Sequence, residues 1–167
     1  MLNTRVIVGF VVLIGMTIGN IDAAEPSELL RANRCELESL YRGGQLPSEP
    51  FGFLPGTAIF DAGTRKTVRK SRMIHVVWKG KEFPGNGTMI NQTVFGLRAV
   101  KARVFVSESA FDGQPTLVFD YRGLSMLFGN VRDEVREIEP GVYLGLTYLR
   151  QSDGLLKFSN FFVLDGR

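Results

Sequence analysis

The stretch VRDEVREIEPGVYLGLTYLRQSDGLLKFSNFFVL (residues 131–164) decides the fold, because it holds three strand-like runs separated by two turn signals. The runs cover 131–138, 142–149 and 155–164, and Pro140-Gly141 and Ser152-Asp153-Gly154 separate them. Short turns of this kind join neighbouring antiparallel strands. The stretch therefore predicts an antiparallel meander.

More strand-like runs precede this meander. They cover 57–60, 73–78, 89–95, 98–107 and 116–121. The clearest is 98–107, where Val100, Ala102, Val104 and Val106 alternate with Lys101, Arg103 and Phe105, as expected of a half-buried strand. No strand–helix–strand spacing occurs, which argues against a parallel sheet. The chain is predicted to be mainly β, an antiparallel up-and-down barrel or a strongly curved sheet.

One helix is expected before the strands, at 26–41. Leu29, Leu30, Leu37, Leu40 and Tyr41 recur at helical spacing, and Gly43-Gly44 ends the pattern. The loop that follows, 45–56, contains three prolines together with Phe51, Phe53 and Leu54, which we expect to cover the core or one end of the barrel. Residues 25–167 have the size of a single domain.

The first 24 residues have the order of a secretory signal peptide. Arg5 precedes an apolar stretch at 6–18, and the small residues Ala23 and Ala24 offer a cleavage site. We expect export to the periplasm or the outside of the cell after cleavage near Ala24. An uncleaved membrane anchor is the alternative, although the apolar stretch is short for spanning a bilayer.

The composition narrows the possible functions. A formal charge of +3 is too small to indicate nucleic acid by itself, and a single cysteine, Cys35, excludes an intramolecular disulfide. We expect Cys35 to be buried in the helix. Thirteen Phe residues are typical of a β core or an apolar cavity. The glycosylation-type sequons at Asn86 and Asn91 are interpreted as chance matches in a turn-rich stretch.

A basic cluster occupies residues 65–72 and consists of Arg65, Lys66, Arg69, Lys70 and Arg72, with no carboxylate between them. It could meet lipid headgroups, an anionic polymer or an acidic partner, or it could be a solvated loop. Aromatic side chains do not alternate with these cations, so no nucleic-acid partner is expected.

Three residues are candidates for acid/base chemistry. His75 is the only histidine and lies within an apolar run, while Asp120 and Tyr121 follow another apolar run. An enzyme of the isomerase, cyclase or hydrolase type would need His75 and Asp120 in one cavity. His75 could instead be a hydrogen-bonded wall residue, with Val77 on the same face of a strand. The sequence contains no phosphate-binding loop, nucleophile elbow or metal-ligand spacing, so no cofactor or metal is expected.

Residues 131–138 combine five charged side chains with the apolar residues Val131, Val135 and Ile138. Arg132, Glu134 and Arg136 share one face of the expected strand, and Asp133 and Glu137 share the other. Such a face is either an exposed or pore-facing ladder of ion pairs or, if it is buried, a polar ligand site. The predicted ligand-binding residues are His75, Val77, Phe105, Phe119, Tyr121, Arg132, Arg136 and Tyr148.

The middle of the chain carries a W-x-G-K-x-F pattern from Trp78 to Phe83. Later segments are Val118-Phe119-Asp120, Arg132 with Arg136, Leu144-Gly145 and Phe161-Phe162. On these residues the chain resembles the GXWXG / DUF4334 family of small uncharacterised proteins, although the G-x-W-x-G motif is absent at 41–44. The resemblance implies a small, β-rich, calycin-like barrel. It implies no established activity and no catalytic residue.

Three functions compete on these grounds. The leading hypothesis is an exported barrel that holds a lipid or another small apolar ligand in a hollow, aromatic-lined interior. The second is an envelope protein that docks on anionic surfaces through the 65–72 cluster. The third is the small acid/base enzyme with His75 or Asp120.

Overall fold

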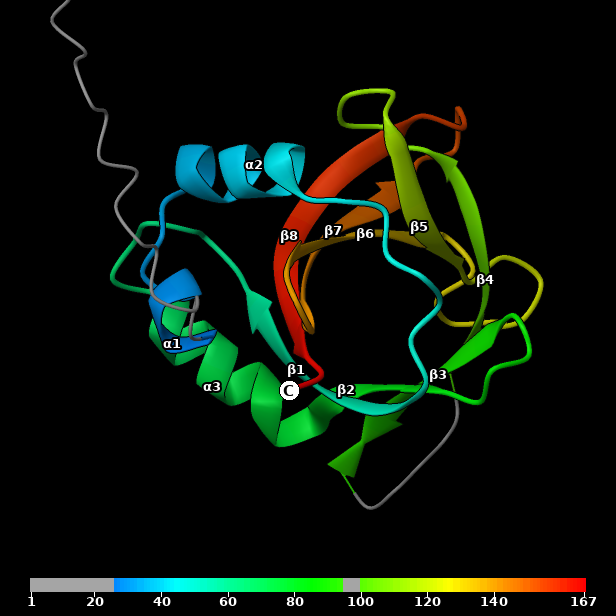
Figure 1. The fold of residues 1–167 in the computed structure, drawn as a ribbon, viewed down its shortest axis with the longest axis horizontal. Helices are drawn as coiled ribbons and strands as arrows, with labels where there is room; N and C mark the ends of the chain where they lie inside the picture. The colour runs from blue at the N-terminus through cyan, green and yellow to red at the C-terminus, as the bar shows by residue number, and fades with distance from the viewer. Residues whose placement is uncertain (1–25, 95–99) are drawn as a thin grey trace, which may run out of the picture.

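The computed structural model describes residues 26–94 and 100–167, and the predicted signal peptide lies outside them. Within these ranges eight antiparallel strands close into one up-and-down barrel, in which each strand pairs with the next and the last pairs with the first (Figure 1). The prediction of a mainly β antiparallel barrel is confirmed. The strands are β1 (Gly52–Ile59), β2 (Trp78–Phe83), β3 (Thr88–Thr93), β4 (Val100–Glu108), β5 (Pro115–Asp120), β6 (Val131–Glu139), β7 (Val142–Arg150) and β8 (Leu156–Asp165).

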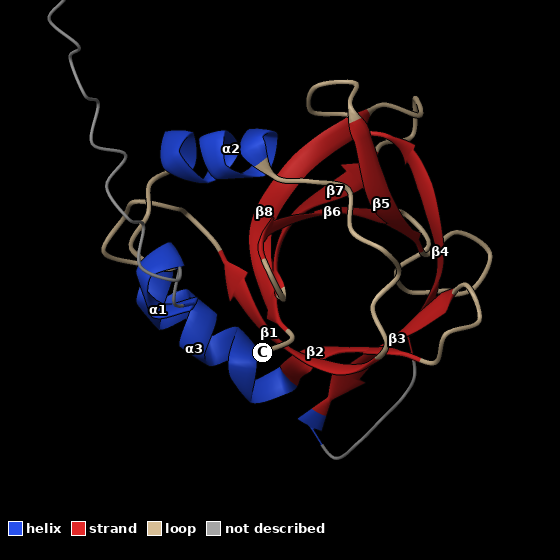
Figure 2. Cartoon of the chain, viewed as in Figure 1, coloured by secondary structure: helices blue, strands red, loops and turns tan. Residues whose placement is uncertain are grey.

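Three helices lie outside the wall of the barrel, on the side of β8 and β1 (Figure 2). They are α1 (Pro26–Leu29), α2 (Arg34–Gly43) and α3 (Thr67–Val77). None of these described helices is long and apolar enough to cross a membrane.

The apolar runs of β7 and β8 are almost continuous because both of their faces are buried. In β8, Phe162 and Leu164 point into the barrel, while Phe161 and Val163 lie under the first two helices with Leu37. A strand covered on one side only would alternate apolar and polar residues. The run at 161–164 thus reflects a wall with a core on each side.

The interior of the barrel is filled by the protein's own side chains. Six residues of its apolar cluster have no accessible surface, so no space as large as a water molecule touches them: Phe83, Met89, Ala102, Phe119, Val135 and Leu164. The predicted hollow is therefore wrong for this part of the interior. Eight strands enclose a volume that side chains can just fill, and the aromatic residues fill it.

Two glycines make room for the largest interior rings. A Cβ atom at Gly56 would lie 2.3 Å from Cη2 of Trp78, and one at Gly145 would lie 2.1 Å from Cζ of Phe162. The two rings meet edge to face with their centroids 6.2 Å apart. Any larger residue at either glycine would push a ring out of the packed interior.

The predicted helix at 26–41 is divided in two. The first helix, α1, ends at Leu29. Asn33 caps α2, because its Oδ1 atom accepts from the Glu36 N–H (3.1 Å) and its own N–H donates to Glu36 Oε2 (2.7 Å). Asn33 and Glu36 thus form a capping box. Cys35 lies in the first turn of α2 and is exposed, so the prediction of a buried cysteine is wrong.

The predicted strand at 73–78 is also wrong, because residues 67–77 form α3. Its β-branched and aromatic residues favour a strand locally. Thr67 and Ser71, four residues apart, are instead buried against the barrel, and the helix ends where the Trp78 ring turns inward. Tertiary packing thus overrides local propensity here. The strand β2 begins only at Trp78 and was missed.

The connection from α2 to β1 crosses one end of the barrel (Figure 2). At one side Gln45 forms a β-bridge with Glu137 of β6, and at the other Glu49 Oε1 accepts from the N–H of Gly87 (3.2 Å) between β2 and β3. Leu54, at the start of β1, is part of the interior cluster. The described residues from 26 onward supply all eight strands of the closed wall and both apolar clusters, so a chain starting at Pro26 keeps every described contact of the fold.

Replacing Gly145 by Ala should lower the free energy of unfolding by about 1–3 kcal/mol, because the new methyl group overlaps the rigid Phe162 ring. Urea unfolding followed by circular dichroism measures this change. The matched control is Gly43→Ala at the end of α2, where a Cβ meets nothing within 4 Å. Equal stability of the two variants would show that the close approach at Gly145 is not needed.

Candidate functional site

A cluster of polar side chains lies inside the barrel, next to the apolar side chains that pack there. Five strands or their ends supply it: Lys81 from β2, Asn91 from β3, Tyr121 just after β5, Asp133 from β6 and Thr147 from β7. Their strand pairings place them all on the inner face, since Lys81 pairs with Asn91 and Asp133 pairs with Thr147. We call these five residues the inner polar cluster.

The ammonium group of Lys81 is fully occupied within this cluster. Its Nζ atom lies 2.8 Å from Asp133 Oδ2, 2.7 Å from the Tyr121 hydroxyl and 3.0 Å from Asn91 Oδ1. An ammonium has three N–H groups, and these are three acceptors. No donor of Lys81 is left for a ligand.

The acceptors of the inner polar cluster are occupied as well. Asp133 Oδ2 also accepts from the Tyr121 hydroxyl (2.9 Å), and Asp133 Oδ1 accepts from Thr147 Oγ1 (2.8 Å). Asn91 donates to the Tyr121 oxygen (2.9 Å), and its Oδ1 atom accepts from the Trp78 indole (2.9 Å). The ion pair is buried, with side-chain exposures of 3% for Lys81 and 4% for Asp133.

Aromatic rings surround the charge. The Lys81 ammonium lies 5.1 Å from the centre of the Phe162 ring and 5.5 Å from the centres of the rings of Trp78, Phe119 and Tyr121. Ring faces attract a cation, which offsets part of the cost of removing it from water. Burial still lowers the pKa of Lys81, an effect that the neighbouring Asp133 opposes. Burial and the Asp133 charge raise the pKa of Tyr121.

A second polar group lies on the outer face of β6, and its members share one face as the alternation predicted. Arg132 Nε donates to Glu134 Oε1 (2.8 Å), and Arg136 forms two bonds of 2.7 and 2.8 Å with the carboxylate of Asp112. Glu134 in turn accepts from Ser109 and from the Ala110 N–H. These bonds tie β6 to the turn between β4 and β5, and the Arg136 interaction lowers the pKa of Asp112. The ladder is thus a structural brace.

The residues predicted to bind a ligand do not meet in one place. Phe119 and Tyr121 face the interior, whereas Tyr148 belongs to the outer cluster under the helices and Phe105 is exposed on the outer wall. Arg132 and Arg136 form the brace described above. His75 and Val77 are exposed on α3 rather than on the barrel wall.

The predicted acid/base pair is not assembled. Asp120 points outward from β5 and pairs with Arg122 (3.3 Å) and Arg150 (3.7 Å), while its neighbour Tyr121 points inward. His75 lines a small pocket of about 210 Å³ with Asp165 and Arg167, which Asp120 does not line. The geometry required for the enzyme hypothesis is therefore missing. Within residues 26–94 and 100–167 no three potential metal ligands cluster either.

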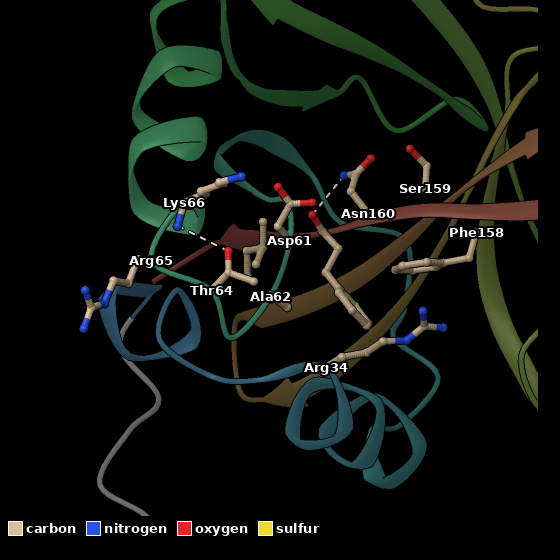
Figure 3. A pocket seen from close by; sticks show the side chains of 11 residues that line it. Arg34, Asp61, Ala62, Thr64, Arg65, Lys66, Phe158, Ser159 and Asn160 are labelled. Atoms are coloured by element: carbon tan, nitrogen blue, oxygen red, sulfur yellow. Dashed lines mark hydrogen bonds between the residues drawn. The ribbon is translucent and has the colours of Figure 1, made fainter.

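A larger pocket lies outside the barrel wall, between the start of α2, the segment after β1 and the start of β8 (Figure 3). Its volume is about 650 Å³. Apolar atoms of Ile59, Ala62, Phe158 and Phe161 line it together with polar and charged groups. We call it the outer pocket.

Cations flank the outer pocket. The Arg34 guanidinium lies 4.8 Å from the centre of the Phe158 ring and is held by a 2.6 Å bond from its Nε atom to Glu38. Lys66 and Arg65 also line the pocket, and Figure 3 shows Arg65 pointing away from the other side chains. The carboxylate of Asp61 is paired with Lys70 of α3. No ion pair among the described residues involves Arg65 or Lys66, so the lining has a positive balance.

The predicted basic cluster is solvent-exposed except for Lys70, which is half-buried. Arg65 and Lys66 lie in the turn before α3, whereas Arg69, Lys70 and Arg72 lie on the helix itself. The sequon residue Asn86 is exposed in a turn, but Asn91 belongs to the inner polar cluster.

The chain matches no protein-family model, no curated protein and no solved structure. Function must therefore be inferred from the described geometry.

Sequence reasoning missed the inner polar cluster, although two signals were present. Lys81 is part of the W-x-G-K-x-F pattern, and Asp133 was placed on the opposite face from Arg132 by its position in the alternation. The other missed residues are Arg34 and Phe158 of the outer pocket, which come from opposite ends of the chain. No local pattern links these two.

Replacing Asp133 by Asn should lower the free energy of unfolding by about 3–5 kcal/mol, because it leaves the Lys81 ammonium buried without a counter-charge. Chemical denaturation at neutral pH measures the loss. The matched control is Asp165→Asn, which breaks the more exposed pair with Arg167 and should cost about 1 kcal/mol or less. If both variants lost the same small amount, the buried pair would not be a stabilising contact.

Tyrosine ionisation should destabilise the fold at alkaline pH. Burial raises the pKa of Tyr41 from 10.0 to about 12, so between these values the unfolded chain has released a proton that the folded protein keeps. The stability that this tyrosine contributes is therefore complete below pH 10 and is lost as the pH rises toward 12. Unfolding free energies of the wild type and Tyr41→Phe, measured across this range, should converge as the pH rises. A constant difference would contradict the raised pKa.

Proposed function

We propose that this protein binds a small amphiphilic ligand, with an apolar chain or ring and an anionic group, in the outer pocket. The observation that carries the proposal is the combination of an aromatic wall, Phe158 and Phe161, with the flanking cations Arg34 and Lys66. The ligand class is that of the leading sequence hypothesis, but its site moves from the inside of the barrel to the outside of the wall.

The size and apolar lining of the outer pocket suit such a ligand. A volume of about 650 Å³ lies within the range of small-molecule sites, which are mostly apolar with a few polar groups that orient the ligand. Ile59 and Phe161 are almost fully buried and form a rigid floor, because they also pack in the cluster under the helices. A rigid floor lowers the entropic cost of binding.

The charges favour an anionic group on the ligand. Glu38 and Asp61 are compensated by Arg34 and Lys70, which leaves Lys66 and Arg65 as the net charges beside the pocket. A carboxylate or phosphate close to Lys66 would gain an ion pair, and the Arg34 guanidinium offers a planar donor next to the Phe158 ring. An uncharged ligand of the same length would gain only the apolar contact.

We also propose that residues 1–24 are a signal peptide, so that the barrel acts outside the cytoplasm. Their apolar stretch at 6–18 and the small residues Ala23 and Ala24 support this. Mass spectrometry of the chain purified from a bacterial periplasm should give an N-terminus close to Glu25. A cytoplasmic chain that retains Met1 would contradict export.

Membership in the GXWXG / DUF4334 family remains a proposal as well. It rests on the sequence motifs alone. Each residue of the first motif has a structural role in this barrel: Trp78 and Lys81 meet at Asn91, and Phe83 fills the core. At Gly80 the φ angle is 146°, and a Cβ atom there would lie 2.1 Å from the Leu54 carbonyl oxygen. The spacing W-x-G-K-x-F thus has a physical reason in this barrel.

Isothermal titration calorimetry with dodecanoate and dodecanol tests the ligand proposal. The wild type should bind the carboxylate more tightly than the alcohol. The charge reversals Arg34→Glu and Lys66→Glu should each weaken dodecanoate binding by about tenfold or more, which is about 1.4 kcal/mol, and leave dodecanol binding nearly unchanged.

The matched control is Arg31→Glu, an exposed arginine that does not line the outer pocket. It should bind dodecanoate like the wild type. A wild type that binds neither compound, or an equal loss of binding in all three variants, would overturn the proposal.

A further inference from the structure

The two ends of the barrel differ sharply in chemistry. Because the strands alternate in direction, the connections β1–β2, β5–β6 and β7–β8 all lie at one end, together with α3 and the start of β2. We call this end the rim. The opposite end carries the turns 84–87, 109–114 and 139–141 and is crossed by the α2–β1 connection.

Large apolar side chains stand in solvent on two separate parts of the rim. The β5–β6 connection exposes Met126 and Leu127 to 104% and 86%, with Leu124 and Phe128 beside them at 43% each. At the last turn of α3, Met73, Val76 and Val77 are exposed to between 60% and 65%. Their spacing of three and four residues puts them on one helix face.

Two sets of neighbouring exposed apolar side chains are unusual on a surface that faces only water. Single exposed apolar residues are common on protein surfaces, but sets of neighbouring ones mark contact surfaces. The β5–β6 connection is a tight turn, with the N–H groups of Leu124 and Ser125 bonded to the Tyr121 carbonyl, so it presents these side chains on an ordered backbone.

The charged residues of the rim favour an anionic partner. Its described connections and adjoining strand ends carry the carboxylates Asp61, Asp120 and Asp153, against the cations Arg65, Lys66, Arg69, Lys70, Arg72, Lys79, Arg122 and Arg150. The three turns at the opposite end contain Asp112 and Glu139 and no lysine or arginine. The rim is thus the more positive end of the barrel, and it carries the two most exposed of the large apolar side chains, Met126 and Leu127. The opposite end also exposes apolar side chains, Leu46, Phe51 and Phe53, but without a surplus of cations in its turns.

We propose that the rim docks on an anionic lipid bilayer, with Met126 and Leu127 inserted among the headgroups and the cations of α3 placed over lipid phosphates. Apolar insertion and attraction to anionic lipid strengthen each other at a membrane surface. A soluble acidic protein would match the charges but would not require side chains as exposed as Met126. The proposal is independent of the outer pocket, since none of the inserted residues lines it.

Vesicle flotation tests this with a chain that starts at Pro26, so that the apolar stretch 6–18 does not contribute. The wild type should float with vesicles of mixed phosphatidylglycerol and phosphatidylcholine. Its affinity for vesicles of phosphatidylcholine alone should be lower by about tenfold or more. High salt should weaken its binding to the mixed vesicles.

Two variants with matched chemistry separate the rim from the opposite end. Leu127→Asp should reduce binding to the mixed vesicles by about tenfold, because it removes an inserted side chain and adds a negative charge. Phe51→Asp makes the same kind of change at a residue of similar exposure (80%) before β1, and it should bind like the wild type. Circular dichroism verifies that both variants are folded.

Three results would overturn the proposal. They are no flotation of the wild type with the mixed vesicles, equal loss of binding in both variants, or binding that is unaffected by lipid charge and salt. Light scattering of the lipid-free protein distinguishes a membrane from a second copy of the chain as the partner of the rim. A dimer that Leu127→Asp abolishes would show that a second copy covers the rim instead of a membrane.

Discussion

A lysine ammonium and an aspartate carboxylate, 2.8 Å apart, share the inside of a barrel that is otherwise packed with aromatic and aliphatic side chains. Removing two charges from water is costly unless each of their hydrogen-bonding groups finds a partner. Lys81 and Asp133 meet this condition only because β2, β3, β5, β6 and β7 all bring polar groups to the same level. The buried pair therefore depends on the closed wall, which brings its hydrogen-bonding partners together.

Aromatic side chains fill much of the interior of the barrel. A closed barrel of eight strands has room for its own side chains or for one small ligand, and here Trp78 and Phe162 occupy the room that Gly56 and Gly145 leave. The outer pocket and the smaller pocket at His75 both lie outside this wall. The helices that cover β8 create the outer pocket at their edge, and the connections between strands create the rim.

Much of the fold follows from local patterns. Strands β4 to β8 were predicted within a few residues because alternation and turn signals are properties of neighbouring residues. The strand predicted at 73–78 was wrong because Val76, Val77 and Trp78 favour a strand locally. The burial of Thr67 and Ser71 against the barrel favours a helix instead. The basic cluster was recognised, but its place on a helix beside exposed apolar residues was not.

The amino-acid sequence by itself predicted an antiparallel barrel or curved sheet and showed which residues of β6 share a face, since side chains alternate along a strand with a period of two. It did not determine which groups meet across the barrel. Lys81 and Asp133 are separated by 52 positions, and Arg34 joins Phe158 from the other end of the chain. Only closure of the wall brings such residues together, because the register of eight strands decides their distance, and no local pattern encodes it.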